Sequence, residues 1–228
     1  MEIIWYGGSC VRLKGREGTI AADPFAGIVG PTGRGLTADV VTYGHPDDMA
    51  TNVTARQAKA QTSRRLGVPI PTSLEQAFTL DSPGEYEVHG VMVTGVRTYR
   101  DGAEGAERGQ STAFVYELDG LYTAHLGDVG HLLSQETLGE MGHIDIACLA
   151  IGPALPAGRA AELVAQLDAR LVVPMPTAAD ESAAAEDMER FLREMSVDDP
   201  SPLPKLTASI STIPHETTVV VLESRSRT

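Results

Sequence analysis

The sequence predicts an α/β domain whose sheets mix parallel and antiparallel strands. Short apolar runs alternate irregularly with helical patterns, which does not fit the regular strand–helix repeat of a doubly wound parallel sheet. Asp119-Gly120 stands between two strand-like runs and is the strongest hairpin signal in the chain. The near-continuous apolar run at 144–151 is typical of a strand that is buried on both faces.

The first part of the chain consists of short strand-like runs separated by turns. Asp23-Pro24 ends the third run, because proline cannot donate a hydrogen bond to a ladder. Asn52 or Thr54 is expected to cap a helix that ends near Leu66. The predicted strands in this part are 3–6, 10–13, 19–22 and 40–42.

The second part returns to strands after Ser82-Pro83-Gly84 and then adds helices. A glycine-rich, charged stretch at 100–110 is predicted to form a loop. We expect one domain over 1–228 with two similar halves, about 1–105 and about 111–228. The predicted strands are 86–88, 91–98, 112–118, 121–125, 144–151, 171–173 and 218–222, and the predicted helices are 159–167 and 182–195.

The composition limits the partners that this protein can have. A formal net charge of −13 argues against binding to nucleic acid or to an anionic membrane surface, since both need clustered Lys and Arg. Two cysteines, Cys10 and Cys148, are too few for a disulfide framework or a cysteine-ligated zinc knuckle. The chain has neither a signal-peptide pattern nor an apolar run of about 18 residues, so we expect a cytoplasmic location. Assembly into a homo-oligomer is left open.

A first cluster of polar residues follows the strand predicted at 40–42. His45, Asp47 and Asp48 lie in a loop at a strand end, where sites are commonly built on a rigid scaffold. Histidine and carboxylate together suit Zn²⁺, Mn²⁺ or Fe. The alternative is an ordinary loop whose aspartates cap the next helix.

A second cluster, His125-Leu-Gly-Asp128-Val-Gly-His131, begins where the strand predicted at 121–125 ends. Its two histidines could bind a metal ion or a ligand. The alternative is that each is a core histidine or one oriented by an aspartate.

Together these clusters resemble the metallo-β-lactamase fold superfamily, in its small single-domain Zn-dependent hydrolase-like branch. This resemblance implies a four-layer αββα sandwich of two mixed sheets, with the site at the strand ends between the sheets. The motifs that carry it, in chain order, are Trp5-Tyr-Gly-Gly-Ser9-Cys10, Asp23-Pro24-Phe25, the loop at 42–48, Pro83-Gly84-Glu85-Tyr86, Thr98-Tyr-Arg-Asp101, Arg108-Gly109, the cluster at 125–131, Val173-Pro-Met175 and Ile213-Pro214.

The candidate site departs from the pattern of that superfamily. Members with two metal ions use Thr-His-x-His-x-Asp-His in the first loop, a further histidine after the strand at 91–98, a bridging aspartate and a last histidine after a Pro-Met pair. His45, Asp47 and Asp128 match this pattern. The positions of the lost histidines are occupied by Tyr43, Asp48, Arg100 and Pro176.

These replacements change the cofactor that we expect. A tyrosine must lose a proton with a pKa of about 10 to be a strong ligand, and proline has no donor atom. The Arg100 guanidinium would compete with a metal cation for the same carboxylates. We therefore expect either no metal or one divalent ion at His45, Asp47, Asp48 and Asp128, with Mn²⁺, Mg²⁺ or Ca²⁺ favoured over Zn²⁺.

One hypothesis concerns Arg100 itself. Buried carboxylates need a counter-charge, so Arg100 is predicted to act as a surrogate cation that pairs with Asp128 and with Asp47 or Asp48. Arg100, His125 and His131 are then candidates for binding a small anionic ligand.

Three functions follow from these residues. The first is a hydrolase-like protein with a degenerate metal centre that binds a small molecule or has weak, metal-independent activity, with His45 and Asp47 as the catalytic candidates. The second is a hydrolase of esters, lactones or phosphodiesters that uses one non-standard metal ion. The third is a structural or partner-binding protein. Cys10, in the first motif, is expected to be buried rather than reactive.

Overall fold

The computed structural model describes residues 1–46, 61–178 and 180–225. Its strands form two mixed sheets. The first sheet has the order β12-β1-β2-β3-β4-β5. Its strands are β1 (Glu2–Gly7), β2 (Cys10–Lys14), β3 (Thr19–Ala22), β4 (Val40–Thr42), β5 (Phe78–Leu80) and β12 (Leu206–Thr207).

The second sheet has the order β13-β11-β10-β9-β8-β7-β6. In the described residues, its parallel part runs from β13 to β9 and its antiparallel part from β9 to β6. Its strands are β6 (Gly84–Val88), β7 (Val91–Tyr99), β8 (Gln110–Leu118), β9 (Leu121–His125), β10 (Ile146–Ile151), β11 (Leu171–Pro176) and β13 (Thr218–Val219).

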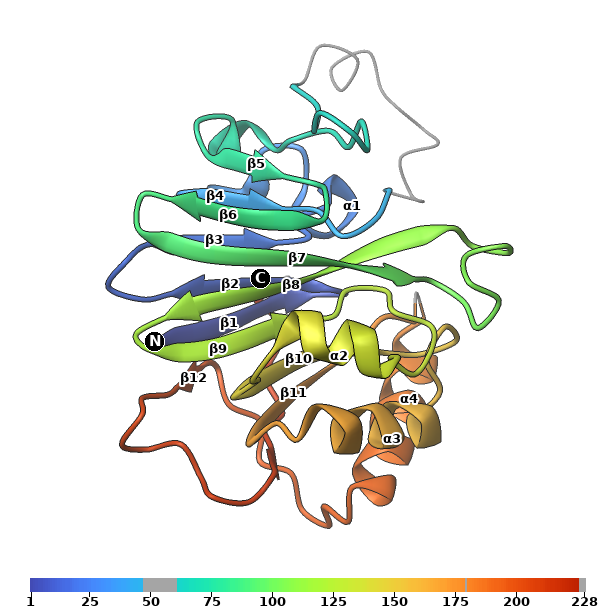
Figure 1. Ribbon diagram of the computed structural model, residues 1–228. Coiled ribbons are helices and arrows are strands. Elements are labelled where there is room, and N and C mark those ends of the chain that lie inside the picture. The colour runs from blue at the N-terminus through green and yellow to red at the C-terminus, as the bar shows by residue number, and fades with distance from the viewer. Residues whose placement is uncertain (47–60, 179, 226–228) are drawn as a thin grey trace.

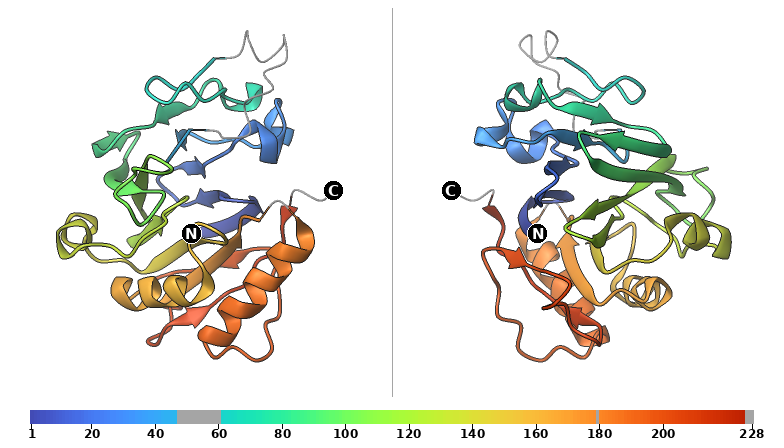
Figure 2. Two further views of the ribbon diagram at one scale, coloured as in Figure 1. Left: turned by 90° about the vertical axis from the view of Figure 1, so that its right-hand side faces the viewer. Right: turned by 60° about the vertical axis from the view of Figure 1, so that its left-hand side comes forward.

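The two sheets stack face to face (Figure 1). Side chains of β1–β3, such as Leu13 and Ile20, share a buried core with side chains of β8 and β10, such as Phe114 and Ile146. Three helices pack on the outer face of the second sheet, as the turned views show (Figure 2): α2 (Gln135–Met141), α3 (Ala157–Leu167) and α4 (Glu181–Glu194).

The outer face of the first sheet is covered differently. The short helix α1 (Ala26–Val29) packs there, together with apolar residues of the 66–74 segment such as Ile70 and Leu74. Two 3₁₀ turns, Gly33–Gly35 and Thr72–Leu74, pack against each other beside it. The architecture is therefore the αββα sandwich of two mixed sheets that the resemblance implied.

The two strongest strand signals in the sequence are confirmed. β8 and β9 form a hairpin in which Leu118 faces Leu121, and Asp119 and Gly120 both have positive φ, as a tight type I′ turn requires. β10 is buried along its whole length and has parallel neighbours on both sides, β9 and β11. An apolar strand of this kind needs cover on both faces, which the first sheet and α3 provide.

Other elements differ from the prediction. The helix expected to reach Leu66 is wrong over 61–66, where the chain forms a bridge and a turn; its earlier part lies outside the described residues. Residues 61–66 are held in the turn by tertiary hydrogen bonds, since Asp81 accepts from the backbone amides of Arg65 and Leu66. The helices α1 and α2 and the strands β5 and β12 were not predicted, because each has seven residues or fewer and carries little periodicity.

The division into two similar halves stays a prediction. The first sheet takes its strands from residues 2–80 together with β12, whereas β6 and β7 already belong to the second sheet. Among the described residues, no helix has the length and apolar character that crossing a membrane demands.

Candidate functional site

The candidate site lies at one end of the sandwich, where several strands stop. β3 leads into Asp23, β4 into the segment 43–46, β7 into Arg100 and β9 into the segment 126–128. Because β3 and β4 are parallel, and β9 is parallel to β10, their carboxyl ends meet at the edges of the two sheets.

A glycine brings the two sheets together at this end. The carbonyl oxygen of Gly44, after β4, accepts hydrogen bonds from the Thr112 amide at 2.7 Å and from the Ser111 hydroxyl at 3.3 Å, both on β8. A Cβ atom on Gly44 would lie 2.7 Å from the Thr112 carbonyl oxygen. Only glycine permits this approach, so the residue before His45 is fixed against the second sheet.

Asp23 holds the same loop from the side of the first sheet. Its backbone has a φ of 48°, and its side chain is fully buried. Oδ1 accepts a hydrogen bond from the Gly44 amide at 2.8 Å, whereas Oδ2 has no hydrogen-bond partner in the described part of the chain. From the sequence, Asp23 is predicted only to end a strand; its place in the Asp23-Pro24-Phe25 motif is the signal that points to a role at the site.

His45 sits between Asp23 and an aromatic ring. Its Nδ1 lies 2.8 Å from the carbonyl oxygen of Pro46, an acceptor, so Nδ1 carries the proton and Nε2 is left as an acceptor in the neutral ring. Nε2 is 3.7 Å from Asp23 Oδ2, and the ring packs against Phe25 with centroids 4.8 Å apart. The next two predicted residues, Asp47 and Asp48, lie outside the described residues.

Asp128 is held by two arginines. The Arg100 Nε and Nη2 atoms and the Arg108 Nη2 atom each lie 2.8 Å from Asp128 Oδ2. The Arg100 side chain is 6% exposed and the Arg108 side chain 40%. The predicted ion pair between Arg100 and Asp128 is therefore confirmed, whereas the further partner expected at Asp47 or Asp48 lies outside the described residues.

The loop at 100–110 folds back so that its two arginines meet. The Arg108 Nη1 atom donates to the Arg100 carbonyl oxygen at 3.1 Å, and the Arg100 Nη1 atom to the Arg108 carbonyl oxygen at 3.3 Å. Asp101 orders the turn between them, since its carboxylate accepts from the amides of Ala103, Gly105, Glu107 and Arg108. These bonds, led by that from the Arg108 amide, hold the pKa of Asp101 below its usual value.

The histidines of the second cluster make structural contacts. His125 is fully buried, and its Nε2 donates to the Ser9 carbonyl oxygen at 2.7 Å, which ties β9 to the turn after β1. His131 accepts from the Tyr99 amide through Nε2 and donates to the Leu132 carbonyl oxygen through Nδ1. Both rings therefore have a structural role, and their ligand-binding role stays a prediction.

The structure also describes Tyr43, Pro176 and Cys10, the other residues that the sequence singled out. Tyr43 is fully buried and packs against Phe25, with ring centroids 5.5 Å apart. Pro176 ends β11, opposite Ile151 of β10. Cys10 is buried as expected, and burial, together with the nearby Asp23 charge, raises the pKa of its thiol well above the usual value.

Several of the predicted positions contact other groups or lack a side-chain donor atom. Asp128 Oδ2 is occupied by guanidinium groups, Pro176 has no donor atom, and both nitrogens of His131 are used by the backbone. Within the ranges that the structure describes, no group of three or more His, Cys, Asp or Glu side chains is arranged to hold a metal ion.

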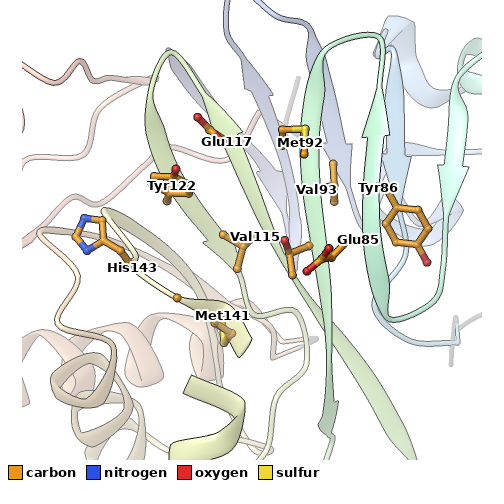
Figure 3. A pocket seen from close by; sticks show the side chains of 11 residues that line it. Glu85, Tyr86, Met92, Val93, Val115, Glu117, Tyr122, Met141 and His143 are labelled. Carbon is orange, nitrogen blue, oxygen red and sulfur yellow. The ribbon is translucent and has the colours of Figure 1, made fainter. Parts of the chain in front are cut away.

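A separate groove of about 490 Å³ lies on the exposed side of β6–β9, beside the end of α2 (Figure 3). Met92, Val115 and Tyr122 line it, together with polar residues such as Glu85 and His143. None of the predicted site residues that the structure describes lines this groove, which is therefore separate from the described part of the candidate site.

Comparisons with known proteins agree with this architecture. The family described as the beta-lactamase superfamily domain matches residues 2–176. A UPF0173 metal-dependent hydrolase of Methanoregula boonei is 30% identical over 199 residues, covering 82% of this chain and 86% of that protein. A protein of the same description from Geobacillus thermodenitrificans is 28% identical over 201 residues, covering 77% and 84%.

A solved structure is similar over nearly the whole chain. It is a Thermotoga maritima protein assigned to the metallo-β-lactamase superfamily as a Zn-dependent hydrolase. The TM-score is 0.70 at 26% sequence identity, and the similarity covers 98% of this chain and 99% of that one.

Proposed function

The chain belongs to the beta-lactamase superfamily domain family, and from this premise we propose that it is a hydrolase-like member with a degenerate metal centre. In this proposal the protein does not hold two metal ions, and it binds a small anionic molecule at the strand ends. Relatives are named metal-dependent hydrolases, so the proposal concerns how this chain differs from them.

The observation that supports the proposal is the pair of guanidinium groups on Asp128. The resemblance gives this aspartate the role of bridging two metal ions, which requires a carboxylate that is free to bind cations. Here Arg100 and Arg108 supply the positive charge instead, through three contacts of 2.8 Å to one oxygen. A fixed guanidinium and a metal ion repel each other, so both cannot occupy this oxygen.

The same contacts define what the site can do chemically. His45 presents an acceptor nitrogen and can take a proton from a bound molecule or from water, which contributes about 10²–10⁴-fold to a rate. Asp23 fixes the loop that carries His45. Arg108 is partly exposed and can contact an anion in front of the buried Arg100–Asp128 pair.

A second candidate function is supported by one observation. Asp23 Oδ2 is a buried acceptor with no hydrogen-bond donor among the described residues, and it lies 3.7 Å from His45 Nε2. Buried acceptors of this kind favour a bound cation or water. A hydrolase with one divalent ion at His45, Asp47, Asp48 and Asp128 is therefore the alternative, with ester, lactone or phosphodiester substrates.

Metal content separates these two functions. We would purify the protein without a chelator or a metal-affinity tag and measure metals by plasma mass spectrometry, before and after dialysis against Zn²⁺ or Mn²⁺. The proposal expects washable metal well below one ion per chain, and thermal stabilisation by small anions that a chelator does not change. Near-stoichiometric metal that survives dialysis would overturn it and favour the one-metal hydrolase.

The other expectations stay predictions. These are the cytoplasmic location and the lack of nucleic-acid and membrane binding, with assembly into a homo-oligomer left open. A purely structural or partner-binding role predicts that neither metal ions nor anions change the thermal stability.

A further inference from the structure

Two arginines line a cleft of about 290 Å³ beside the candidate site, and none of the described residues that line it is acidic. These are Arg65, in the turn after residue 61, and Arg97, on β7. In the part of the chain that the structure describes, neither guanidinium forms an ion pair, whereas Arg16, Arg170 and Arg190 each pair with a carboxylate. Two unpaired cations in one cleft are unexpected in a chain with a net charge of −13.

The Arg65 side of the cleft is fixed by the fold. The buried Asp81 carboxylate accepts hydrogen bonds from the amides of Arg65 and Leu66. The ends of the same turn are closed by a bridge between Thr62 and Pro69. The position of Arg65 is thus set before any ligand binds, which lowers the entropic cost of binding.

On the other side of the cleft, the β7–β8 ladder sets the position of Arg97. Arg97 is exposed and faces Thr112 across the β7–β8 ladder, on the face of β7 opposite to the buried Val96 and Thr98. Gln110 and Ser111 of β8 line the cleft next to it and add an amide and a hydroxyl group. Arginine forks and such neutral donors are the groups that proteins use for phosphate oxygens.

The cleft also adjoins the catalytic candidate. Gly44 and Pro46, the residues on either side of His45, both line it. Gly44 is bonded to Ser111 and Thr112, so the wall shared by the cleft and the site is rigid. A molecule anchored in the cleft therefore has its other end beside the loop that carries His45.

We propose that Arg65 and Arg97 bind the phosphate group of a small phosphomonoester, and that this cleft is the anion subsite of the protein. Two guanidinium groups match the double negative charge of such a phosphate, with Gln110 and Ser111 as further donors. The inference rests on the proposed function, because it names the class of the anionic molecule and the group that is recognised.

The test is phosphate binding by the full chain, with inorganic phosphate as the probe. Isothermal titration at constant ionic strength, with chloride as the balancing anion, compares the unchanged protein with Arg65→Gln and Arg97→Gln. The matched control is Arg64→Gln, which removes the same charge from the neighbouring residue of the same turn but does not line the cleft. Acetate serves as a monoanionic comparison.

We expect saturable phosphate binding that each cleft variant weakens about tenfold, because a charge-assisted hydrogen bond is lost, while Arg64→Gln changes it less than twofold. Acetate should bind more weakly than phosphate. Equal losses in all three variants would mean a general charge effect and would overturn the inference, as would the absence of saturable binding.

The result also distinguishes failure of the inference from failure of the proposed function. If Arg108→Gln abolishes phosphate binding and the cleft variants do not, the anion binds beside Asp128. In that case the assignment of the subsite to the cleft is wrong, but the proposed function is not. If phosphate binds as expected but a metal ion is retained after dialysis, the assignment of the cleft as a phosphate subsite is supported and the proposal of a degenerate metal centre is wrong.

Discussion

Replacing Arg100 by methionine tests whether this side chain is the cation that Asp128 needs. The substitution keeps an apolar stem of similar length and removes the guanidinium. It leaves the Asp128 carboxylate, whose side chain is 14% exposed, with Arg108 as its remaining ion-pair partner in the described structure. The expected result is a large loss of stability.

The size of the loss follows from burial. Removing one partner of a fully buried ion pair costs about 3–5 kcal/mol, because the other charge is left without compensation. Here Arg108 remains and Asp128 is partly hydrated, so we expect about 2–3 kcal/mol for Arg100→Met. Arg108→Met is the matched control: its side chain is 40% exposed, and an exposed pair contributes about 0.5–1 kcal/mol.

Urea unfolding at neutral pH measures both changes, provided the slope with denaturant is the same for all variants. A double-mutant cycle with Asp128→Asn isolates the Arg100–Asp128 contact, and we expect a coupling energy of about 1.5–2.5 kcal/mol. If Arg100→Met costs no more than Arg108→Met, or if the coupling energy is below about 0.5 kcal/mol, Arg100 is not the main counter-charge of Asp128.

Three further predictions concern the surroundings of the site. Amide hydrogen bonds lower the pKa of Asp101 in the folded protein. Its contribution to stability is therefore present above the ordinary carboxyl pKa and is lost as the pH falls through the lowered value. Asp101→Asn should speed hydrogen exchange of the Arg108 amide at neutral pH and change that exchange little in acid. Gly44→Ala should cost about 1–3 kcal/mol in urea unfolding, because the new Cβ would overlap the Thr112 carbonyl, and an unchanged midpoint would contradict the close approach of the sheets. Cys10 should react with a thiol reagent only as fast as the protein unfolds, since its thiol is buried with a raised pKa; fast labelling of the native protein would contradict this.

The strands were the most predictable part of the fold. Alternating or continuous apolar runs bounded by Gly, Pro and Asp identify them, as in β8 and β9 around Asp119-Gly120. The edge strand β5 was missed because its burial depends on one neighbour, β4, and its first residue, Phe78, is 53% exposed. Local pattern is a weak guide where only one side of a strand is paired.

At 61–66 the error is of the other kind: a helix is predicted there, but the chain forms a turn. Its residues suggested a continuing helix, yet the buried carboxylate of Asp81 takes two of its backbone amides. A tertiary hydrogen bond to a charged group outweighs the small differences in helix propensity. That contact also places Arg65 in the cleft, so the proposed anion subsite could not be found from the sequence.

The amino-acid order alone identifies the chemical groups at the strand ends: His45 and Asp128 match the superfamily pattern, and Arg100 and Pro176 stand where the pattern has histidines. Residue type fixes donor atoms and charge, and strand patterns fix the order in which they arrive. Which of these groups contact one another depends on how distant segments pack. Arg108 reaches Asp128 because the loop at 100–110 folds back, and Gly44 meets Thr112 because the two sheets close at that point, contacts set by packing between distant parts of the chain.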